Sequence, residues 1–373
     1  MVHSENNSVK SRIVNFIEDS ITPFVNDPAS FTKSWPLFGK ENLFGLMSKA
    51  YRDDDLGSLN EHLILVEELC KVPISGFMIS FLSQGWIIEI LERLSTNDYH
   101  KKILDNFKKG EAIGSFCLTE PSYGSSYSNL ATLAVNVNGK WDITGGKIYI
   151  TNAAFANYFI VVANTGKESK QSISFFLLER DSVTIEKEIE FMGNRNSGIS
   201  KLKIKCKNMD EKHLLGKVGV GFLTLPQCLN YERMDISLYS VFLAKECLIR
   251  TNSFLRKRKN QGERITDYQV IRYKLVNMYS RLEIMKSFVL STAKKFVLKE
   301  ECSKDILISK IYSTETARDI ILEAIQLTGA YGFTEESKLI SMFNDIAPLA
   351  VGGGSNDVLR NALFRSANSL ARS

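Results

Sequence analysis

The sequence predicts a mostly α-helical protein with a β domain in its middle third. Three observations support this fold class. In the first third, apolar residues recur three and four positions apart, as in SLNEHLILVEELCKV, which is the spacing of an amphipathic helix. Short β-rich runs with turn signals at Asn138-Gly139 and Gly145-Gly146 fill the middle third. Long helical periods then return, and only seven prolines interrupt the 373 residues.

This order predicts three domains. We expect residues 1–113 to form a helical domain, with GWIIEILERLS as a further amphipathic run. Residues 114–222 should form the β domain, where YFIVVANTG, SISFFLLER and SKLKIKCKNM continue the strand pattern. Residues 223–373 should form a second helical domain, whose last long period can end at Gly329 or Gly332. A cleft where helical and β layers meet is a common ligand site.

Composition and charge narrow the classes of function. Apolar residues make up 44% and charged residues 24% of the chain, as in ordinary globular proteins. The formal net charge of +5 is mild. The basic run Arg256–Lys259 lacks the larger aromatic-rich patch of a nucleic-acid site, so we interpret it as a solvated helix end and expect no nucleic-acid partner. The four histidines form no cluster, and no metal is expected.

The cysteines and the apolar runs indicate in which cellular compartment the protein works. Six cysteines are widely spaced without a CxxC pair, which predicts buried thiols in a reducing cytoplasm and not a disulfide framework. The first twenty residues lack an apolar core of signal-peptide length. No run reaches the roughly 18 apolar residues that span a bilayer, so no membrane partner is expected.

The stretch FCLTEPSYGSS is the most specific local signal. An apolar strand runs into a polar turn, where the hydroxyls of Thr119 and Ser125 could bind a flat polar ring or a phosphate. Gly124 would let such a ligand approach the backbone. Taken alone, the stretch is more typical of a turn without a ligand. Further along, ITGGKIYITNA places Tyr149 and Thr151 as an aromatic wall beside a hydroxyl.

These two stretches together resemble the acyl-CoA dehydrogenase family, whose pattern is a TEP-x-x-GS turn followed by a G-x-K-x-[WY]-I-T-N strand. The resemblance continues in order along nearly the whole chain, through MGNRNSG, GKVGVGF, RKNQGERITDYQ and QLTGAYGF. It implies an N-terminal helical domain, a middle β-barrel and a C-terminal four-helix bundle. It also implies that FAD lies extended between the barrel and the bundle.

The resemblance assigns residues to the FAD site. It implies that the isoalloxazine ring is lined by Phe116, Leu118, Thr119, Tyr149 and Thr151. Near the FAD or the thioester arm of the substrate it places Gly124 and Ser125. The residues implied to reach the far end of an FAD in a neighbouring subunit are Arg258, Asn260, Gln326 and Gly329. Over the adenosine it places Ser355 and Asp357. Such contacts between subunits imply a homo-oligomer, most simply a tetramer.

The resemblance also locates the base that the family's reaction needs. The common glutamate position falls at Gly353 in VGGGSNDVLR, and a glycine cannot take a proton. The isovaleryl and long-chain branches carry the glutamate in a Glu-Arg pair on a helix of the C-terminal domain instead. Glu232 and Arg233 in LNYERMDIS match that pair. We therefore predict that Glu232 is the base, with Arg233 and Gly353 beside the substrate.

Alternative roles remain open for the carboxylates. Glu232 could be an ordinary carboxylate near a helix start, paired with solvent or an arginine. Glu120 of the TEP turn is a weaker candidate for the base and is expected to hold the loop. Asp357, the only acid in VGGGSNDVLR, resembles the aspartate base of nitroalkane-oxidising relatives but does not align with a base.

The resemblance leaves three hypotheses for the activity. Glu232 with Gly353 also resembles a branch that oxidises prolyl or other aminoacyl thioesters on carrier proteins in natural-product pathways, and we favour this hypothesis. The second is a dehydrogenase of short or branched acyl-CoA. The third is a non-catalytic relative that keeps the fold for binding. Carrier proteins are acidic and CoA is anionic, so the mild basic charge fits either substrate. The electron acceptor could be oxygen or an electron-transfer flavoprotein.

Overall fold

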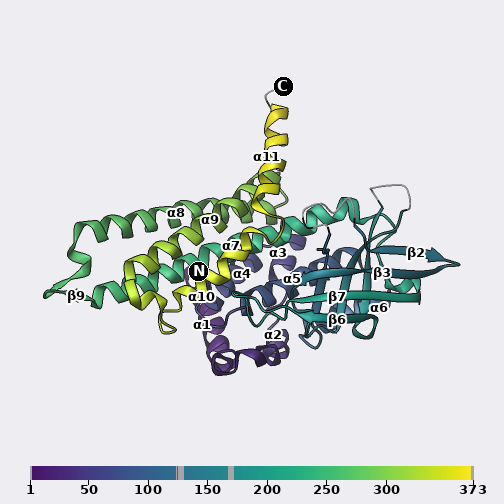
Figure 1. Cartoon of the computed structure of the whole chain (residues 1–373), viewed down its shortest axis with the longest axis horizontal. Helices are drawn as coiled ribbons and strands as arrows, with labels where there is room; N and C mark the ends of the chain where they lie inside the picture. The colour runs from purple at the N-terminus through teal and green to yellow at the C-terminus, as the bar shows by residue number, and fades with distance from the viewer. Residues whose placement is uncertain (1, 123, 125–129, 167–171, 371–373) are drawn as a thin grey trace.

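A sheet lies at one end of the molecule and long helices at the other, with further helices packed against both (Figure 1). The computed structural model describes residues 2–122, 124, 130–166 and 172–370. Helices come first, strands occupy the middle of the chain and helices follow to its end. The predicted fold class, mostly α with a β domain in the middle, is confirmed.

The first helices build an aromatic core and then a scaffold for the sheet. The helices are α1 (Val2–Ser20), α2 (Trp35–Lys40), α3 (Leu46–Asp53), α4 (Leu56–Leu69), α5 (Phe77–Leu94) and α6 (Asp98–Lys108). Asp55 and Asn97 cap α4 and α6, because each side chain accepts a hydrogen bond from a backbone amide in the first turn. Helix α5 is buried on nearly every side, since it packs against α6, α7 and the first strand.

The middle segment forms one eight-stranded sheet. Its strands are β1 (Gly114–Cys117), β2 (Leu133–Val137), β3 (Lys140–Ile150), β4 (Tyr158–Asn164), β5 (Ile173–Glu179), β6 (Val183–Glu188), β7 (Ser200–Met209) and β8 (Leu214–Leu215). The order is β6-β7-β3-β2-β4-β5-β8, and β1 pairs with β4 in parallel. The Asn138-Gly139 turn joins β2 to β3, with both residues in the left-handed region that such a turn requires.

Strands β4 and β5 carry side chains into two different cores. Alternate residues point to opposite faces of a strand. Ile160 and Phe175 join the core shared with the helices, whereas Phe159 and Phe176 join a second core with Trp141 on the other face. This burial on both faces explains why YFIVVAN and ISFFLLE are nearly continuous apolar runs.

The last third is a bundle of long helices. They are α7 (Gly221–Lys257), α8 (Gln269–Val297), α9 (Ser303–Thr328), α10 (Leu339–Ile346) and α11 (Asn356–Leu370). Helix α7 packs against both α8 and α9 and is buried along most of its length. It starts against the sheet, since a Cβ atom at Gly221 would lie 2.6 Å from the Ile173 carbonyl oxygen. A short hairpin of β9 (Lys259–Asn260) and β10 (Glu263–Arg264) connects α7 to α8 at the far end (Figure 1).

A buried carboxylate fixes α7 against the N-terminal helices. Asp235 accepts a hydrogen bond from Trp86 Nε1 of α5 at 2.9 Å. Its other oxygen lies 2.8 Å from Nε2 of His62 on α4. All three side chains are buried, so these bonds set the rotation of α7 about its axis. They therefore also set where Glu232, three residues earlier, points.

The six cysteines are all free and buried, as predicted. Within the described residues, no helix is long and apolar enough to cross a membrane.

Replacing Asp235 should destabilise the protein, because two buried donors would lose their acceptor. We expect Asp235→Ala to lower the free energy of unfolding by about 3–5 kcal/mol. Asp235→Asn keeps one acceptor oxygen and should lose less. Urea unfolding followed by circular dichroism measures both. A loss below about 1 kcal/mol for Asp235→Ala would show that the network does not anchor α7.

Candidate active site

The candidate site forms where α7 passes the glycine-rich loop before α11. Glu232 lies about three turns into α7. The residue is partly exposed, so a bound molecule could reach it. The loop, residues 351–355, follows the short helix Ala347–Ala350. Sequence positions more than a hundred residues apart therefore meet at one point.

Gly353 adjoins the Glu232 carboxyl group directly. Its φ of +65° lies in the left-handed region that favours glycine. A Cβ atom at this position would lie 3.7 Å from the carboxyl carbon of Glu232 and 3.3 Å from Cγ of Arg233. Positions 232 and 353 are therefore neighbours in space, and a carboxylate on either one would occupy nearly the same region.

Arg233 links α7 to this loop. Its Nε donates a hydrogen bond to the Gly353 carbonyl oxygen at 2.8 Å. Its Nη1 donates to Oδ1 of Asn230, one turn earlier on α7, also at 2.8 Å. The guanidinium group is thus held in a fixed direction beside Glu232, and it places a positive charge there.

The pKa of Glu232 is shifted into the neutral range. Burial raises this pKa to about 7, because removal from water disfavours the charged carboxylate. The positive charges of Arg233 and Lys310 and the nearby Gly353 amide oppose the rise, whereas the like charge of Asp235 adds to it. A carboxyl group with a pKa near 7 can both accept and release a proton at neutral pH.

Glu120 of the TEP turn holds that turn in place. Its carboxylate oxygens accept hydrogen bonds from the amides of Ala131 at 2.6 Å and Thr132 at 2.9 Å. The Lys147 ammonium group donates to the same carboxylate at 2.8 Å, and both side chains are buried. Although burial opposes ionisation, Lys147 and these amides lower the pKa of Glu120. Both oxygens are occupied by structural partners, as expected of a residue that holds the loop.

The two sequence stretches around the sheet come together. The Ile148 amide of β3 donates a hydrogen bond to the Thr119 carbonyl oxygen at 3.0 Å, which places the end of β1 beside β3. Phe116, Leu118 and Thr119 are all partly buried there. Directly after β3, the Thr151 carbonyl oxygen accepts a hydrogen bond from Ser115 Oγ of β1 at 2.9 Å.

Tyr149 presents an uncovered aromatic ring at this junction. It is 56% exposed, and its ring meets that of Phe191 edge-on at a centroid distance of 6.1 Å. Its φ of +60° is rare for a residue with a side chain, so the fold holds this ring outward against a backbone preference. Within the described residues, the hydroxyls of Thr119 and Thr151 make no hydrogen bond. The junction thus offers an aromatic face and free hydroxyl groups.

The remaining predicted residues near the loops have simpler surroundings. Gly124 is exposed, with open space where a Cβ atom would lie. Ser125 lies outside the described residues. Ser355 accepts a hydrogen bond from the Val358 amide at 3.4 Å at the start of α11. Asp357 is exposed in the first turn of α11 and pairs with Arg360 at 3.0 Å.

Four predicted residues lie together at the far end of the helical bundle. Stacked rings of Phe254 and Tyr331, 4.0 Å apart, hold the end of α7 beside the end of α9. The four residues are exposed on this end and comprise Arg258, Asn260, Gln326 and Gly329. Figure 1 shows the β9 hairpin at the opposite end of the molecule from β2 and β3. Within one chain, the 37-residue helix α7 separates this group from the sheet, whose strand β3 carries Tyr149.

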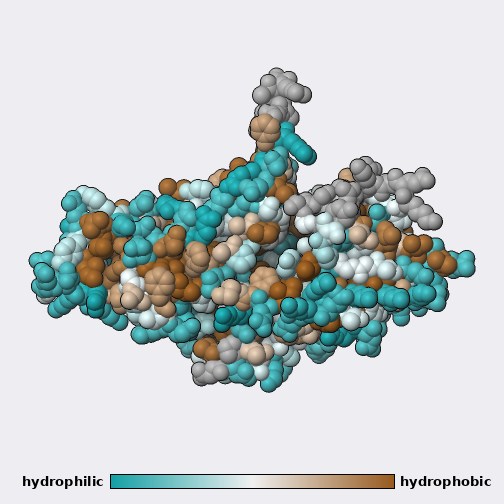
Figure 2. Space-filling view, viewed as in Figure 1, coloured by the Kyte–Doolittle hydropathy of each residue, from teal (hydrophilic) through white to brown (hydrophobic). Residues whose placement is uncertain are grey.

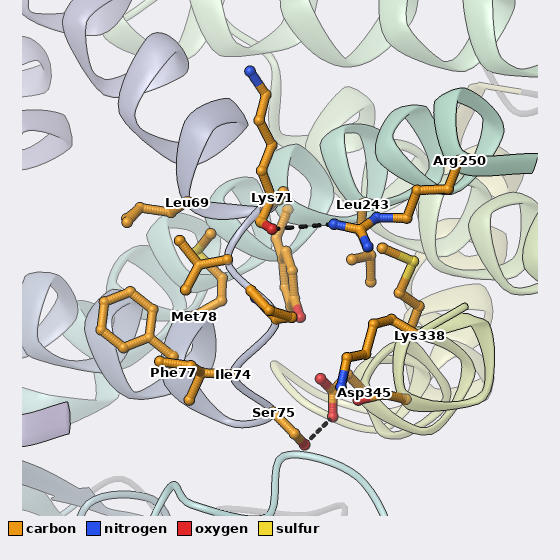
Figure 3. A pocket seen from close by; sticks show the side chains of 16 residues that line it. Leu69, Lys71, Ile74, Ser75, Phe77, Met78, Leu243, Arg250, Lys338 and Asp345 are labelled. Carbon is orange, nitrogen blue, oxygen red and sulfur yellow. Dashed lines mark hydrogen bonds between the residues drawn. The ribbon is translucent and has the colours of Figure 1, made fainter. Parts of the chain in front are cut away.

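A separate pocket lies between the α4–α5 connection, α7 and α10 (Figure 3). In it, Ser75 Oγ donates to the Asp345 carboxylate at 2.6 Å, and the Asn194 amide donates to the same oxygen, also at 2.6 Å. Burial raises the pKa of Asp345 to about 6 despite these bonds. None of the predicted site residues lines this pocket. Its polar contacts fasten the MGNRNSG segment to α10.

A residue beside Glu232 was not predicted from the sequence. Lys310 of α9 is completely buried, and its ammonium group contacts the loop next to Asn356. A sequence signal existed, because Lys310 falls on the buried stripe of α9 between Ile306 and Ala317. A lysine on such a stripe needs acceptors around it.

Comparison with known proteins identifies one family along the chain. Family models described as "Acyl-CoA dehydrogenase, middle domain" and "Acyl-CoA dehydrogenase, C-terminal domain" match residues 115–206 and 219–367. The chain is 27% identical over 371 residues to a mitochondrial 2-methylacyl-CoA dehydrogenase from Solanum tuberosum, covering 95% of this chain and 89% of the relative.

Solved structures share the fold. An acyl-CoA dehydrogenase from Geobacillus kaustophilus matches with a TM-score of 0.89 and 24% identity over 97% of each chain. PigA, determined with FAD and proline, matches with a TM-score of 0.89 and 22% identity over 98% of this chain and 97% of its own.

The raised pKa of Glu232 predicts a pH-dependent effect of Glu232→Gln on stability. A carboxyl group whose folded pKa is raised stabilises the fold below its unfolded pKa and loses this contribution as pH rises through the folded value. The parent should therefore lose about 3 kcal/mol relative to the variant between about pH 4.5 and 7. Urea unfolding at a series of pH values measures the difference.

Glu120→Gln provides the contrasting control, because the pKa of Glu120 is lowered. This variant should lose stability relative to the parent as pH rises. A pH-independent difference between Glu232→Gln and the parent would contradict the placement of the carboxyl group in a desolvated site.

Proposed function

The chain belongs to the acyl-CoA dehydrogenase family of FAD-dependent oxidoreductases, and from this premise we propose that it desaturates an acyl thioester with Glu232 as the base. The observation that carries the proposal is the setting of Glu232. Its carboxyl group has a pKa of about 7, a fixed cation beside it and a loop glycine against it. Glycine at 353 leaves room where a side chain would touch the carboxyl group.

The protein's part in the reaction is a proton transfer from carbon to Glu232. The bond between the α-carbon of the thioester and its hydrogen breaks, and the proton passes to a Glu232 oxygen. The electron pair left on the α-carbon forms the new double bond as hydride leaves the adjacent carbon. FAD, when bound, supplies the acceptor for that hydride at its N5 atom. Arg233 holds the Gly353 peptide in place, so Glu232 keeps its direction during the transfer.

The residues around the Tyr149 junction fit a flavin ring. A flat tricyclic ring with a polar edge needs an aromatic or apolar wall and nearby hydrogen-bonding groups. Tyr149 supplies an uncovered ring, and Thr119 and Thr151 supply unengaged hydroxyls. Phe116 and Leu118 would complete the apolar wall. We assign the adjoining phosphate or thioester contacts to Gly124 and Ser125, and the adenosine contacts to Ser355 and Asp357.

The far-end group supports assembly of several copies. Arg258, Asn260, Gln326 and Gly329 are remote from the Tyr149 junction of their own chain, so they would serve an FAD bound by a neighbouring subunit. The helical end also carries hydrophobic surface (Figure 2). On α8 the exposed apolar residues include Val270, Tyr273, Val276 and Tyr279. A second copy covering this face would remove it from water. We propose a homo-oligomer, most simply a tetramer.

For the substrate, we propose a prolyl or other aminoacyl thioester on a carrier protein in natural-product biosynthesis. The pairing of Glu232 with Gly353 supports it, and the structural neighbour PigA was determined with proline. A short or branched acyl-CoA is the second candidate, which is favoured by the 2-methylacyl-CoA dehydrogenase among the relatives. The electron acceptor of the reduced protein is either oxygen or an electron-transfer flavoprotein.

Replacing Glu232 tests the base. Glu232→Gln should keep the yellow colour of bound flavin and lower the rate of flavin bleaching by substrate about 10²–10⁴-fold. Because only ionised Glu232 can take the proton, the parent's rate should rise with pH through about 7. Stopped-flow absorbance measures both. The matched control is Glu246→Gln, on the same helix but paired with Arg250, which should bleach as the parent does.

Near-normal bleaching by Glu232→Gln would overturn the assignment of the base. A parent protein that is purified without colour, and takes up no FAD, would instead support the non-catalytic alternative.

A substrate panel tests the carrier-protein assignment. We expect prolyl-loaded carrier protein to bleach the flavin and to lose two hydrogen atoms per step, because the thioester α-hydrogen is the acidic one. Flavin absorbance and mass spectrometry follow the reaction, with unloaded carrier protein as the control. Bleaching by short or branched acyl-CoA alone would refute the prolyl assignment and leave the acyl-CoA alternative.

A further inference from the structure

Lys310 is a buried amine that no step above uses. Burial lowers its pKa to about 7, whereas the nearby carboxylate of Glu232 favours its charged form. Lys310 lies in α9 and has no exposed surface. Burying an ammonium group is costly unless its three N–H bonds find acceptors. Its buried neighbours along α9 include Ile306 before it and the hydroxyl residues Ser313 and Thr314 after it, and none of these side chains carries a negative charge. The position of Lys310 therefore demands specific partners.

All three partners lie in or directly beside the loop of residues 351–355. Nζ of Lys310 donates hydrogen bonds to the carbonyl oxygens of Ala350 and Gly354, both at 3.0 Å. The third bond goes to Oδ1 of Asn356, the first residue of α11, at 2.8 Å. The acceptors lie before, within and after the 351–355 segment. One ammonium group therefore ties together both ends of the loop.

Asn356 connects this clamp back to α9. Its Nδ2 donates to Thr314 Oγ1 at 3.1 Å and to Glu315 Oε1 at 3.0 Å. Glu315 in turn forms a two-pronged ion pair with Arg360 at 2.6 and 2.7 Å. The start of α11 is thus fixed to α9 by side chains on both helices, and the loop is left little freedom.

The loop that Lys310 fixes is the one that touches Glu232. The Gly353 carbonyl oxygen accepts from Arg233, and its amide lies close enough to Glu232 to favour the ionised carboxylate. Lys310 also acts on Glu232 through its charge. The charged groups that face Lys310 are Glu232 and Arg233 on α7 and Glu315 on α9. A cation here stabilises the ionised base against the cost of burial.

We propose that Lys310 is a positioning residue, whose buried ammonium group holds the 350–356 segment so that the Gly353 peptide stays against Glu232 and a positive charge faces the base. The inference rests on the proposed function of Glu232. It adds a role for a residue on a third helix, one that reaches the base through the loop and through its charge, without contact with the reacting atoms.

The first test needs no substrate. The stability difference between the parent and Glu232→Gln develops over a pH window that reports the Glu232 carboxyl group. The free energy of unfolding is also compared between Lys310→Met and the double variant Lys310→Met/Glu232→Gln. All four proteins are purified with their flavin. Without the cation, the midpoint of this window should move to higher pH by about one unit or more. An unchanged midpoint would overturn the charge effect.

The second test measures flavin bleaching, with prolyl-loaded carrier protein and a short branched acyl-CoA as probes. Lys310→Met should bleach at least about tenfold more slowly at pH 7 and recover partly at higher pH, while flavin content stays the same. Ser309→Ala is the matched control, because Ser309 is the adjacent buried residue of α9 and bonds to Thr292 on α8. The proposal would be refuted if Lys310→Met had the same bleaching rate and the same pH profile as Ser309→Ala.

Asn356→Ala keeps the proposal testable if Lys310→Met does not fold. It removes one of the three acceptors of Lys310 without burying an unpaired charge. The bleaching rate and its pH profile should change in the same direction as in Lys310→Met, but by a smaller amount. The two proposals fail in different ways. Fast bleaching by Glu232→Gln defeats the assigned base. The role of Lys310 alone is defeated by a different result. In that case Glu232→Gln is inactive, while Lys310→Met and Asn356→Ala bleach the flavin at the same rate as Ser309→Ala.

Discussion

The hydrogen bond from Arg233 to the Gly353 carbonyl is the constraint on which the site depends. It joins a helix that begins at the sheet to a loop near the end of the chain. Further hydrogen bonds hold both the helix and the loop in place. Asp235 fixes the rotation of α7, and Lys310 fixes the loop. A carboxylate between two such supports can be kept away from water without losing its direction, which a flexible side chain on an unsupported helix could not achieve.

Much of the fold was predictable because its periodic patterns are strong. Helices such as α4 and α5, and strands such as β4 and β5, carry apolar residues at spacings that few other structures satisfy. Sheet order was not predictable, since β1 pairs in parallel with β4 across a long stretch of chain. That pairing depends on contacts such as Gln84 with the Gly114 amide, which no local pattern reveals.

The site was predictable to a lesser extent. Family motifs pointed to Glu232 and Gly353, and the fold places these two residues in contact. Lys310, Asp235 and Asn356 escaped sequence reasoning, because their importance lies in partners distant in the chain. A charged residue at a buried position of a helix indicates that a partner exists, but it does not identify that partner. For Arg258 and Gln326, the partner would come from another copy, so the structure of one chain leaves their role a proposal.

The buried cysteines bear on what the protein tolerates during turnover. Burial raises the pKa of all six thiols, so almost none is present as thiolate near neutral pH. Peroxide attacks the thiolate and needs access to it. Should the reduced protein hand its electrons to oxygen, the hydrogen peroxide released would meet no reactive sulfur of this kind. Peroxide released during turnover would then oxidise these six cysteines only slowly.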